Sequence, residues 1–351
     1  MNFNYPVILT SFFFACFVFS LLINYIMLRF VQTLGIRGKE AYQVRWNPNS
    51  KPALGGISFY VIFLFAQIFT ILLSDKTLSF NLPLLGILIA GTLAFMMGLA
   101  DDAFNTQPLL KFLTQIVCAF IIIFSGHNVS IFENQFLNYF ITVLWVVGMM
   151  NSINMLDNMD GITTIVSITA CMFIVGVNIS MYKTTNYTTI INLGVLGALC
   201  GFLVYNFHPS KMFMGDTGSQ FLGLFLAVEG IDNCWNNSLS PMVNGFPLIN
   251  LLLVALVFML PLTDTTTVIV NRLRAGKSPF IGGKDHTTHH LYFRGITEKR
   301  IAILYFLLSS AGCFIGYNLI FNFSYPLFYG AIAFFGVVFV TLYLNTVIKK
   351  G

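Results

Sequence analysis

The segment PLLGILIAGTLAFMMGLADD, residues 83–102, joins a membrane-spanning pattern directly to a pair of acidic residues. Residues 83–100 carry no charge, and about twenty apolar residues are what a helix needs to cross the hydrocarbon core of a bilayer. Asp101 and Asp102 follow at the predicted helix end, where the helix dipole disfavours acidic side chains. Because carboxylates at membrane depth are costly and usually functional, this segment predicts a membrane protein with a site at the end of a span.

The composition of the whole chain agrees with this segment. Of 351 residues, 57% are hydrophobic and only 9% are charged, and the mean hydropathy is +0.81, whereas a soluble domain carries about a quarter charged residues. The apolar runs are continuous and lack the alternating pattern of an outer-membrane barrel. The sequence therefore predicts an all-α polytopic integral membrane protein that forms one domain over residues 1–351.

Eleven apolar segments are predicted to be transmembrane helices. They cover residues 6–31, 54–74, 83–100, 109–126, 138–152, 161–181, 188–207, 219–234, 246–270, 301–321 and 325–347. The first lacks a basic region before it and is too long for a signal peptide, so we expect it to be retained. The six cysteines lie mostly inside apolar runs without paired spacing, which indicates small buried side chains rather than disulfides.

The distribution of Lys and Arg predicts the orientation of these spans. With the N-terminus outside, only Lys76 and Lys183 of the 18 Lys and Arg residues fall outside, and the other sixteen fall inside. Lys349 and Lys350 then place the C-terminus in the cytoplasm, which requires an odd number of spans. The longest cytoplasmic loop covers residues 271–300. The basic residues are dispersed through loops, so the net charge of +5 does not indicate a nucleic-acid partner.

Five polar islands interrupt the apolar chain, and this orientation places all of them at the cytoplasmic face. They are residues 98–102, 151–161 and 213–219, then Asp264, then residues 285–290. Most acidic residues of the chain lie in or beside them. Such a pattern is typical of a membrane enzyme that acts on a polyanionic, metal-bound substrate. For Asp101 and Asp102 we expect a general base or nucleophile beside a cation; the alternative is a solvated acid pair.

In the second island, Asn151, Asn154, Asp157 and Asp160 recur every third residue. On a helix this spacing forms one stripe, and oxygen-bearing side chains suit Mg²⁺ or a sugar nucleotide. The alternative interpretation is a polar loop between spans.

In the third island, Asp216 lies in a glycine-rich turn before the predicted eighth span. There Asp216, Thr217 or Ser219 could cap the helix, whose first N–H groups would favour phosphate. Capping without a ligand is the alternative. Mg²⁺ usually binds one or two carboxylates together with substrate phosphates, so Asp216 and one ligand from another loop would suffice.

The last two islands combine an acid with histidines. Asp264 follows Pro261 inside an apolar run, which favours a helix break that faces the site, although packing alone could explain the pair. His286, His289 and His290 would share a face if their segment is helical. Three histidines could bind Zn²⁺, but the neighbouring Lys and Arg residues favour anion binding.

In this order, the islands resemble the polyprenyl-phosphate N-acetylhexosamine-1-phosphate transferases, the glycosyltransferase group 4 family. The resemblance runs from about Arg37 to Arg300. It implies an integral membrane enzyme that depends on Mg²⁺, for which Mn²⁺ could substitute. Members of the family transfer a phospho-sugar from a UDP-sugar to a polyprenyl phosphate and release UMP.

The resemblance also implies roles for particular residues. The turn 52–56 looks like an early Pro-x-x-Gly-Gly motif, and Pro108 and Lys111 look like the Pro and Lys after the acidic pair. The implied catalytic residues are Asp101, Asp102, Asp157 and Asp160; the implied metal ligands are Asp216 and Asn154; the implied substrate-binding residues are Asn151, Lys111, Asp264, His286, His289 and His290. One departure is Asn158, where the family usually has glycine; asparagine tolerates a left-handed backbone better than most residues.

The eleventh span and the spacing of the histidines look more like the UDP-GlcNAc transferases. We therefore expect transfer of GlcNAc-1-phosphate to undecaprenyl phosphate at the plasma membrane, as the first step of a lipid-linked cell-envelope glycan. The chain could also pair with a second copy of itself. A phospho-N-acetylmuramoyl-pentapeptide transferase is the alternative within the family. An ion-coupled transporter would place acids near the membrane midplane, and a membrane scaffold would leave the clustered carboxylates and histidines unexplained.

Overall fold

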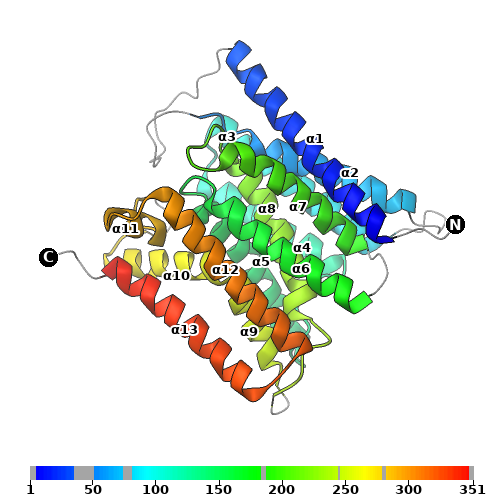
Figure 1. Cartoon of the computed structure of the whole chain (residues 1–351), viewed down its shortest axis with the longest axis vertical. Coiled ribbons are helices and arrows are strands. Elements are labelled where there is room, and N and C mark those ends of the chain that lie inside the picture. Colours follow the sequence, from blue (N-terminus) through cyan, green and yellow to red (C-terminus); the bar gives the residue numbers. More distant parts are fainter. Residues whose placement is uncertain are drawn as a thin grey trace.

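A computed structural model of the chain (Figure 1) describes residues 5–34, 51–73, 81–182, 187–243, 246–278 and 282–347. Within these ranges the chain is helical, with only two isolated β-bridges. The predicted all-α class is therefore confirmed for this part of the chain. Several charged residues used to predict the orientation lie outside the described residues: Arg37, Lys39, Arg45, Lys76, Lys183, Lys349 and Lys350.

The described residues form a series of helices, and all but α11, which lies in the predicted loop 271–300, fall close to a predicted span. They are α1 (Tyr5–Leu34), α2 (Gly55–Leu73), α3 (Leu82–Phe104), α4 (Pro108–Phe124), α5 (Gln135–Leu156), α6 (Ile162–Tyr182), α7 (Tyr187–Asn206), α8 (Gly215–Gly230), the π-helix η1 (Ile231–Trp235), α9 (Leu248–Val257), α10 (Met259–Arg274), α11 (Thr287–Phe293), α12 (Glu298–Phe321) and α13 (Tyr325–Val347). Among them, eight helices are long and apolar enough to cross a membrane, or nine if the bent pair α9–α10 is one span. The full count of eleven spans remains a prediction, because α4 has 17 residues and α8 has 16.

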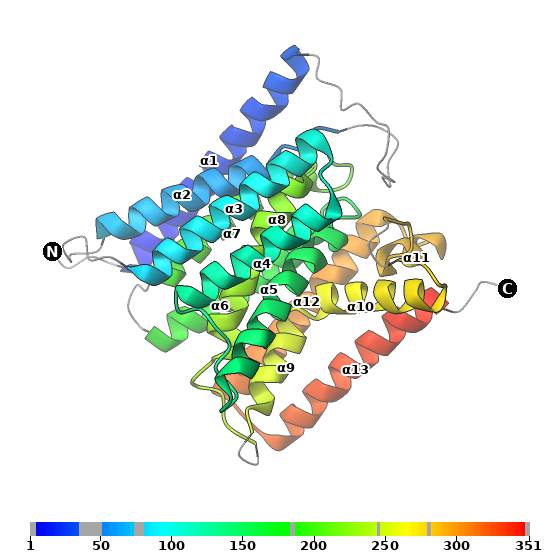
Figure 2. The ribbon, with the colours of Figure 1, turned by 180° about the vertical axis from the view of Figure 1, so that it is seen from behind.

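Helix α8 lies in the middle of the bundle (Figures 1 and 2), where it packs against α2, α3 and α5. Every residue from Thr217 to Gly230 is buried. Small residues make this packing close: a Cβ atom on Gly223 would lie 2.6 Å from the Cα atom of Met150 in α5. Such contacts are typical of helices that associate in membranes, where small residues let backbones approach.

The predicted ninth span, residues 246–270, is broken, as expected from Pro261 and Asp264 within it. Helices α9 and α10 meet at Phe258 with a bend of 81°. The break lies just before Pro261, as expected for a residue that lacks an N–H group and is tolerated only in the first turn of a helix. The bend turns α10, which carries Asp264, toward α11.

The stripe expected from Asn151 to Asp160 is also interrupted. Helix α5 ends at Leu156, so Asp157 is its C-cap residue and Asp160 lies in the following turn. Gly161 then takes a φ of +76°, which glycine adopts without strain. The two aspartates therefore do not continue the helical stripe that the two asparagines begin.

Candidate active site

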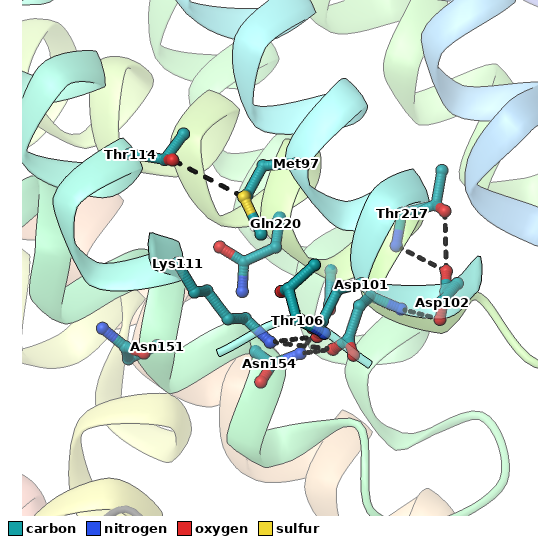
Figure 3. Close-up of polar contacts among 12 residues, drawn as sticks. Met97, Asp101, Asp102, Thr106, Lys111, Thr114, Asn151, Asn154, Thr217 and Gln220 are labelled. Carbon is teal, nitrogen blue, oxygen red and sulfur yellow. Dashed lines mark hydrogen bonds and ion pairs between the residues drawn. The ribbon is translucent and has the colours of Figure 1, made fainter. Parts of the chain in front are cut away.

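Asp102, in the last turn of α3, caps the first turn of α8. Its Oδ1 atom accepts a hydrogen bond from the N–H of Asp216 (3.0 Å), and its Oδ2 atom accepts from the N–H (2.8 Å) and the hydroxyl (2.6 Å) of Thr217 (Figure 3). The first N–H groups of a helix have no partner inside it. The residue before α8, Met214, supplies no side-chain cap. The prediction that α8 is capped from its own sequence was wrong, because the cap comes from α3.

For this arrangement, the backbones of α2 and α3 must lie close to the first turn of α8. A Cβ atom on Gly98 would lie 2.3 Å from the carbonyl oxygen of Asp216, and one on Gly56 would lie 2.2 Å from the nitrogen of Gly218. Gly215 has a φ of +72°, which a residue with a Cβ atom rarely adopts. Gly56 and Gly98 therefore let α2 and α3 pack closely against the start of α8.

The turn 52–56 fixes the loop before Asp216 from the other side. The N–H of Phe213 donates to the carbonyl of Pro52 (3.0 Å), and the N–H of Gly56 donates to the carbonyl of Met214 (3.0 Å). Ala53 and Phe213 form a parallel β-bridge. Two segments about 160 residues apart in the sequence are thus held together by backbone hydrogen bonds, and Asp216 follows directly.

Lys111, in the first turn of α4, connects Asp101 and Asp216. Its Nζ atom lies 2.9 Å from Oδ2 of Asp101 and 3.3 Å from Oδ1 of Asp216 (Figure 3). The other oxygen of Asp101 accepts from the N–H (2.9 Å) and the hydroxyl (2.6 Å) of Thr106. All three charged side chains are mostly buried, so removing one partner would leave an uncompensated buried charge.

Asn154, in the last turn of α5, contacts the same carboxylate. Its amide nitrogen makes a very short hydrogen bond to Asp216 and donates to the hydroxyl of Ser219 at 2.8 Å. The structure therefore brings both predicted metal ligands together. With this amide orientation the Asn154 nitrogen faces Asp216, and Asn154 would present its oxygen to a cation only after the amide group rotates.

Asn151 lies one turn earlier, in a chain of three amides. It donates to Oε1 of Gln115 at 2.8 Å, and the Gln115 amide nitrogen donates to Gln220 of α8 at 3.0 Å. This chain ties α4, α5 and α8 together just behind the carboxylates. This chain of amides contributes to the packing of the three helices. That Asn151 contacts the substrate remains a prediction.

Asp157 differs from the other acids of the site because no described residue donates a hydrogen bond to its carboxylate. The side chain is only partly exposed. Burial, followed by the negative charges of Asp216, Asp102 and Asp160, raises the pKa of Asp157 to about 8. The site thus holds more negative charge than Lys111 alone can balance. An oxygen-rich, electron-rich environment of this kind fits a hard divalent cation such as Mg²⁺.

Asp160 belongs to a neighbouring cluster instead. Its oxygens accept from the N–H (2.9 Å) and hydroxyl (2.7 Å) of Ser210, and Lys51 lies 3.3 Å away. Burial alone would raise the pKa of Asp160, but the bonds from Ser210 and the charge of Lys51 lower it overall. His208 lies within 3.3 Å of Asp160 and 3.0 Å of Glu298. These contacts join the turns after α5 and α7 to the start of α12.

Asp264 holds the first residues of α11. Its carboxylate accepts from Nδ1 of His286 (2.8 Å) and from the N–H (2.8 Å) and hydroxyl (2.5 Å) of Thr287. Asp264 is 1% exposed, which leaves its oxygens no access to a soluble substrate. The helix break before Asp264 is confirmed, whereas the role of Asp264 in the structure is to position the histidine segment.

Helix α11 docks on the second island through Asn158. The hydroxyl of Thr288 donates to Oδ1 of Asn158 at 2.6 Å. His289 faces the backbone of the same residue, and burial together with neighbouring His286 lowers the pKa of His289 to about 4. The polar side chain at position 158, the departure from the family pattern, therefore has a structural partner.

Two of the three histidines contact each other, and a face shared by all three remains a prediction. His286 precedes the helix, and its ring contacts His289 with centroids 5.2 Å apart, whereas His290 contacts Phe293. Within the described part of the chain, the group of His, Cys, Asp and Glu residues close enough to share an ion is Asp160, His208 and Glu298. The three-histidine zinc site is therefore not supported.

Sequence reasoning missed the residues that hold these acids in place. Three such residues donate hydrogen bonds to site residues: Thr106, Ser210 and Gln115. They lie in segments without an unusual pattern, and only the folded chain brings them to the site.

The fold and site define a class: multi-pass helical membrane proteins whose carboxylates gather around a lysine at one end of the bundle. The family model for glycosyl transferase family 4 matches residues 84–233, which include α3 to α8 and the acids at positions 101, 102, 157, 160 and 216. The chain belongs to this family.

Similarity to three relatives shows which named activities occur among proteins that resemble this chain. The chain is 30% identical to the decaprenyl-phosphate N-acetylglucosaminephosphotransferase of Mycobacterium leprae, over 73% of this chain and 70% of the relative. It is 26% identical to a probable undecaprenyl-phosphate N-acetylglucosaminyl 1-phosphate transferase of Bacillus subtilis, over 73% and 70%. It is 28% identical to a phospho-N-acetylmuramoyl-pentapeptide-transferase of Lactobacillus johnsonii, over 75% and 83%.

Proposed function

We propose that this protein transfers GlcNAc-1-phosphate from UDP-GlcNAc to undecaprenyl phosphate, which yields the diphospho-linked lipid and UMP. The relatives that act on N-acetylglucosamine phosphate and polyprenyl phosphates support this activity. The observation that carries the proposal is that Asp101 and Asp216 both contact Lys111, and that Asp157 lies near enough to Asp216 for their charges to interact. Acids from three helix ends thus neighbour one another, which supports a site for a metal-bound diphosphate.

Asp216 and Asp157 would hold the Mg²⁺ ion, with Asn154 as a further ligand. The fit rests on the unpaired Asp157 carboxylate and the excess of negative charge around it. A bound Mg²⁺ would neutralise the charge that develops on the diphosphate as UMP leaves. Lys111 lies between Asp101 and Asp216 and would bind a phosphate oxygen.

We further propose that Asp101 accepts the proton of the lipid phosphate. This task requires only a weak base, because the second pKa of a phosphate monoester is about 6. The hydrogen bonds from Thr106 and Lys111 hold the Asp101 carboxylate in one orientation. A phosphate oxygen freed in this way would attack the β-phosphorus of the UDP-sugar, and UMP would be the leaving group.

The site is proposed to face the cytoplasm of the plasma membrane, with the N-terminus outside and the C-terminus inside. The excess of Lys and Arg in the inner loops supports this orientation. Labelling of single cysteines introduced at Lys277 and Glu133 by a membrane-impermeant maleimide tests it. Glu133 should react in intact cells, and Lys277 should react only after the membrane is opened.

The activity is tested with purified protein, undecaprenyl phosphate, Mg²⁺ and a panel of UDP-HexNAc donors that includes UDP-N-acetylmuramoyl-pentapeptide. We expect UDP-GlcNAc to give the lipid product and an equal amount of UMP. The Asp216→Asn variant should lose at least about a hundredfold in rate, since metal stabilisation is worth several kcal/mol. The Glu133→Gln variant, which alters an exposed acid far from the site, should keep the wild-type rate. Turnover of the muramoyl-pentapeptide donor alone would assign the protein to the other branch of the family.

A further inference from the structure

A crevice of about 190 Å³ lies between α10 and α13, outside the acidic site. It is lined by Thr266, Thr267, Val270 and Arg274 of α10 and by Phe339 and Tyr343 of α13. Both helices border the α11 end of the bundle (Figure 1). The lining combines one cation, three hydroxyl groups and apolar walls, a composition that no step of the proposed reaction uses.

Arg274 provides the charge of this crevice. The side chain is exposed, its guanidinium lies 5.7 Å from the centre of the Tyr343 ring, and it makes a very short hydrogen bond to the Tyr343 hydroxyl. No carboxylate of a described residue forms an ion pair with it. A guanidinium has five N–H donors, so most of them remain available for an anion.

Thr267 provides a second polar group. Its side chain is fully buried, and within the described part of the chain its hydroxyl has no hydrogen-bond partner. Because a buried hydroxyl without a partner is costly, a polar atom in the crevice would relieve this cost. Thr266, which is exposed, adds a hydroxyl at the mouth.

Hydrogen bonds fasten the helices together at one end of the crevice. Asn271 donates to the hydroxyl of Thr346 at 2.9 Å, and Arg294 donates to the carbonyl of Asn345 at 3.0 Å, which fastens α13 to α10 and α11. The outer face of α13 is apolar and exposed, for example at Val340. A ligand would therefore enter from the membrane.

We propose that this crevice binds the headgroup of an anionic phospholipid. The phosphate would bind Arg274 and the Thr267 hydroxyl, and an acyl chain would follow Val270 and Phe339. Sites that enclose a whole small molecule usually measure about 300–1,000 Å³, so the crevice is too small for a sugar nucleotide but sufficient for a headgroup. Arginine is well suited to phosphate because of its planar fork of donors. This inference does not rest on the proposed function.

Such a lipid would hold α10 against α13. Helix α10 also carries Asp264, which positions α11 through His286 and Thr287. Loss of the lipid would therefore loosen the histidine segment as well as the crevice.

The test measures lipid binding by native mass spectrometry of the purified full chain, with phosphatidylglycerol and phosphatidylcholine as probes. We expect the wild type to retain phosphatidylglycerol and not phosphatidylcholine. Arg274→Gln should weaken phosphatidylglycerol binding about tenfold, the effect of losing a charged hydrogen bond. Arg29→Gln is the matched control, because Arg29 also lies over a tyrosine, Tyr25, at 5.4 Å, but does not line this crevice. Arg274→Lys, which keeps the charge and loses the fork, should bind with intermediate affinity.

Two outcomes would overturn the proposal. One is equal retention of phosphatidylglycerol by the wild type and the Arg274→Gln variant, with melting temperatures that show both to be folded. The other is one-for-one displacement of phosphatidylglycerol by undecaprenyl phosphate in the wild type but not in Arg274→Gln, since this would assign the crevice to the acceptor lipid.

Discussion

The two neighbouring aspartates at the end of α3 have different partners. Asp101 faces Lys111 and Thr106, whereas both oxygens of Asp102 accept hydrogen bonds from the start of α8. Asp102 is therefore a positioning residue for the loop that carries Asp216. The sequence predicted that both acids belong to the site, but it could not separate their roles, because the partner of Asp102 lies 114 residues further along the chain.

Replacement of Asp102 by Asn tests the positioning role. An amide can accept with only one atom, and its NH₂ group would face N–H donors of Asp216 and Thr217. We expect a loss of roughly 1–3 kcal/mol in stability, seen as a lower melting temperature, together with reduced activity. Thr217→Val removes only the hydroxyl bond and should show a smaller effect in both measurements. An Asp102→Asn protein with the wild-type melting temperature and no activity would instead indicate a direct chemical role for Asp102.

His289 makes the stability of the protein depend on pH. Its folded pKa of about 4 lies below the ordinary value of 6.5, so the folded state resists protonation. The stabilisation is complete above pH 6.5 and is lost as the pH falls toward 4. The raised pKa of Asp157 has the opposite effect, because its contribution is lost as the pH rises from 3.8 through about 8.

The contribution of His289 is isolated by comparison with a His289→Gln variant. The wild type should lose a few degrees of melting temperature relative to the variant when the pH is lowered from 7.5 to 5, since Gln does not titrate. Both proteins carry Asp157, so its opposite effect cancels in the difference. Parallel curves for the two proteins across this range would refute the burial of a neutral His289.

At the scale of the elements, apolar runs predicted most helices, and the errors fall where an element ends. Helix α5 ends at Leu156 instead of carrying its polar stripe to Asp160, whereas the break of the ninth span at Phe258 agrees with the break expected from Pro261 and Asp264. A three-residue spacing alone does not determine whether a helix continues. Here tertiary hydrogen bonds to Ser210 draw Asp160 away from the helix, and these partners lie 50 residues away in the chain.

Gly98 tests the close contact between α3 and α8. A Cβ atom at this position would lie 2.3 Å from the carbonyl oxygen of Asp216, so Gly98→Ala should push the first turn of α8 away. We expect a destabilisation of about 1–3 kcal/mol, as for overpacking, and a loss of activity. Gly148→Ala in α5 is the matched control, because its Cβ atom would meet nothing within 4 Å. If both variants melt and react like the wild type, the close contact does not fix the site.

At the scale of the whole molecule, the sidedness of the basic residues predicted that the polar islands share one end of the bundle. The structure joins them by contacts: Lys111 links the first and third islands, Asn154 the second and third, and Thr288 the second and fifth. The separate roles of the acids could not be predicted: Asp101 and Asp216 contact Lys111, and Asp157 has no hydrogen-bond donor among the described residues, whereas Asp102, Asp160 and Asp264 accept hydrogen bonds that secure helix ends and turns.

Mn²⁺ binding to the purified protein, followed by electron paramagnetic resonance, tests whether these acids form one divalent-cation site. We expect a single tight site in the wild type and in Glu133→Gln, and at least about tenfold weaker binding in Asp216→Asn and Asp157→Asn, since each loses a charged ligand. Mn²⁺ bound as tightly by Asp216→Asn as by the wild type would contradict such a site.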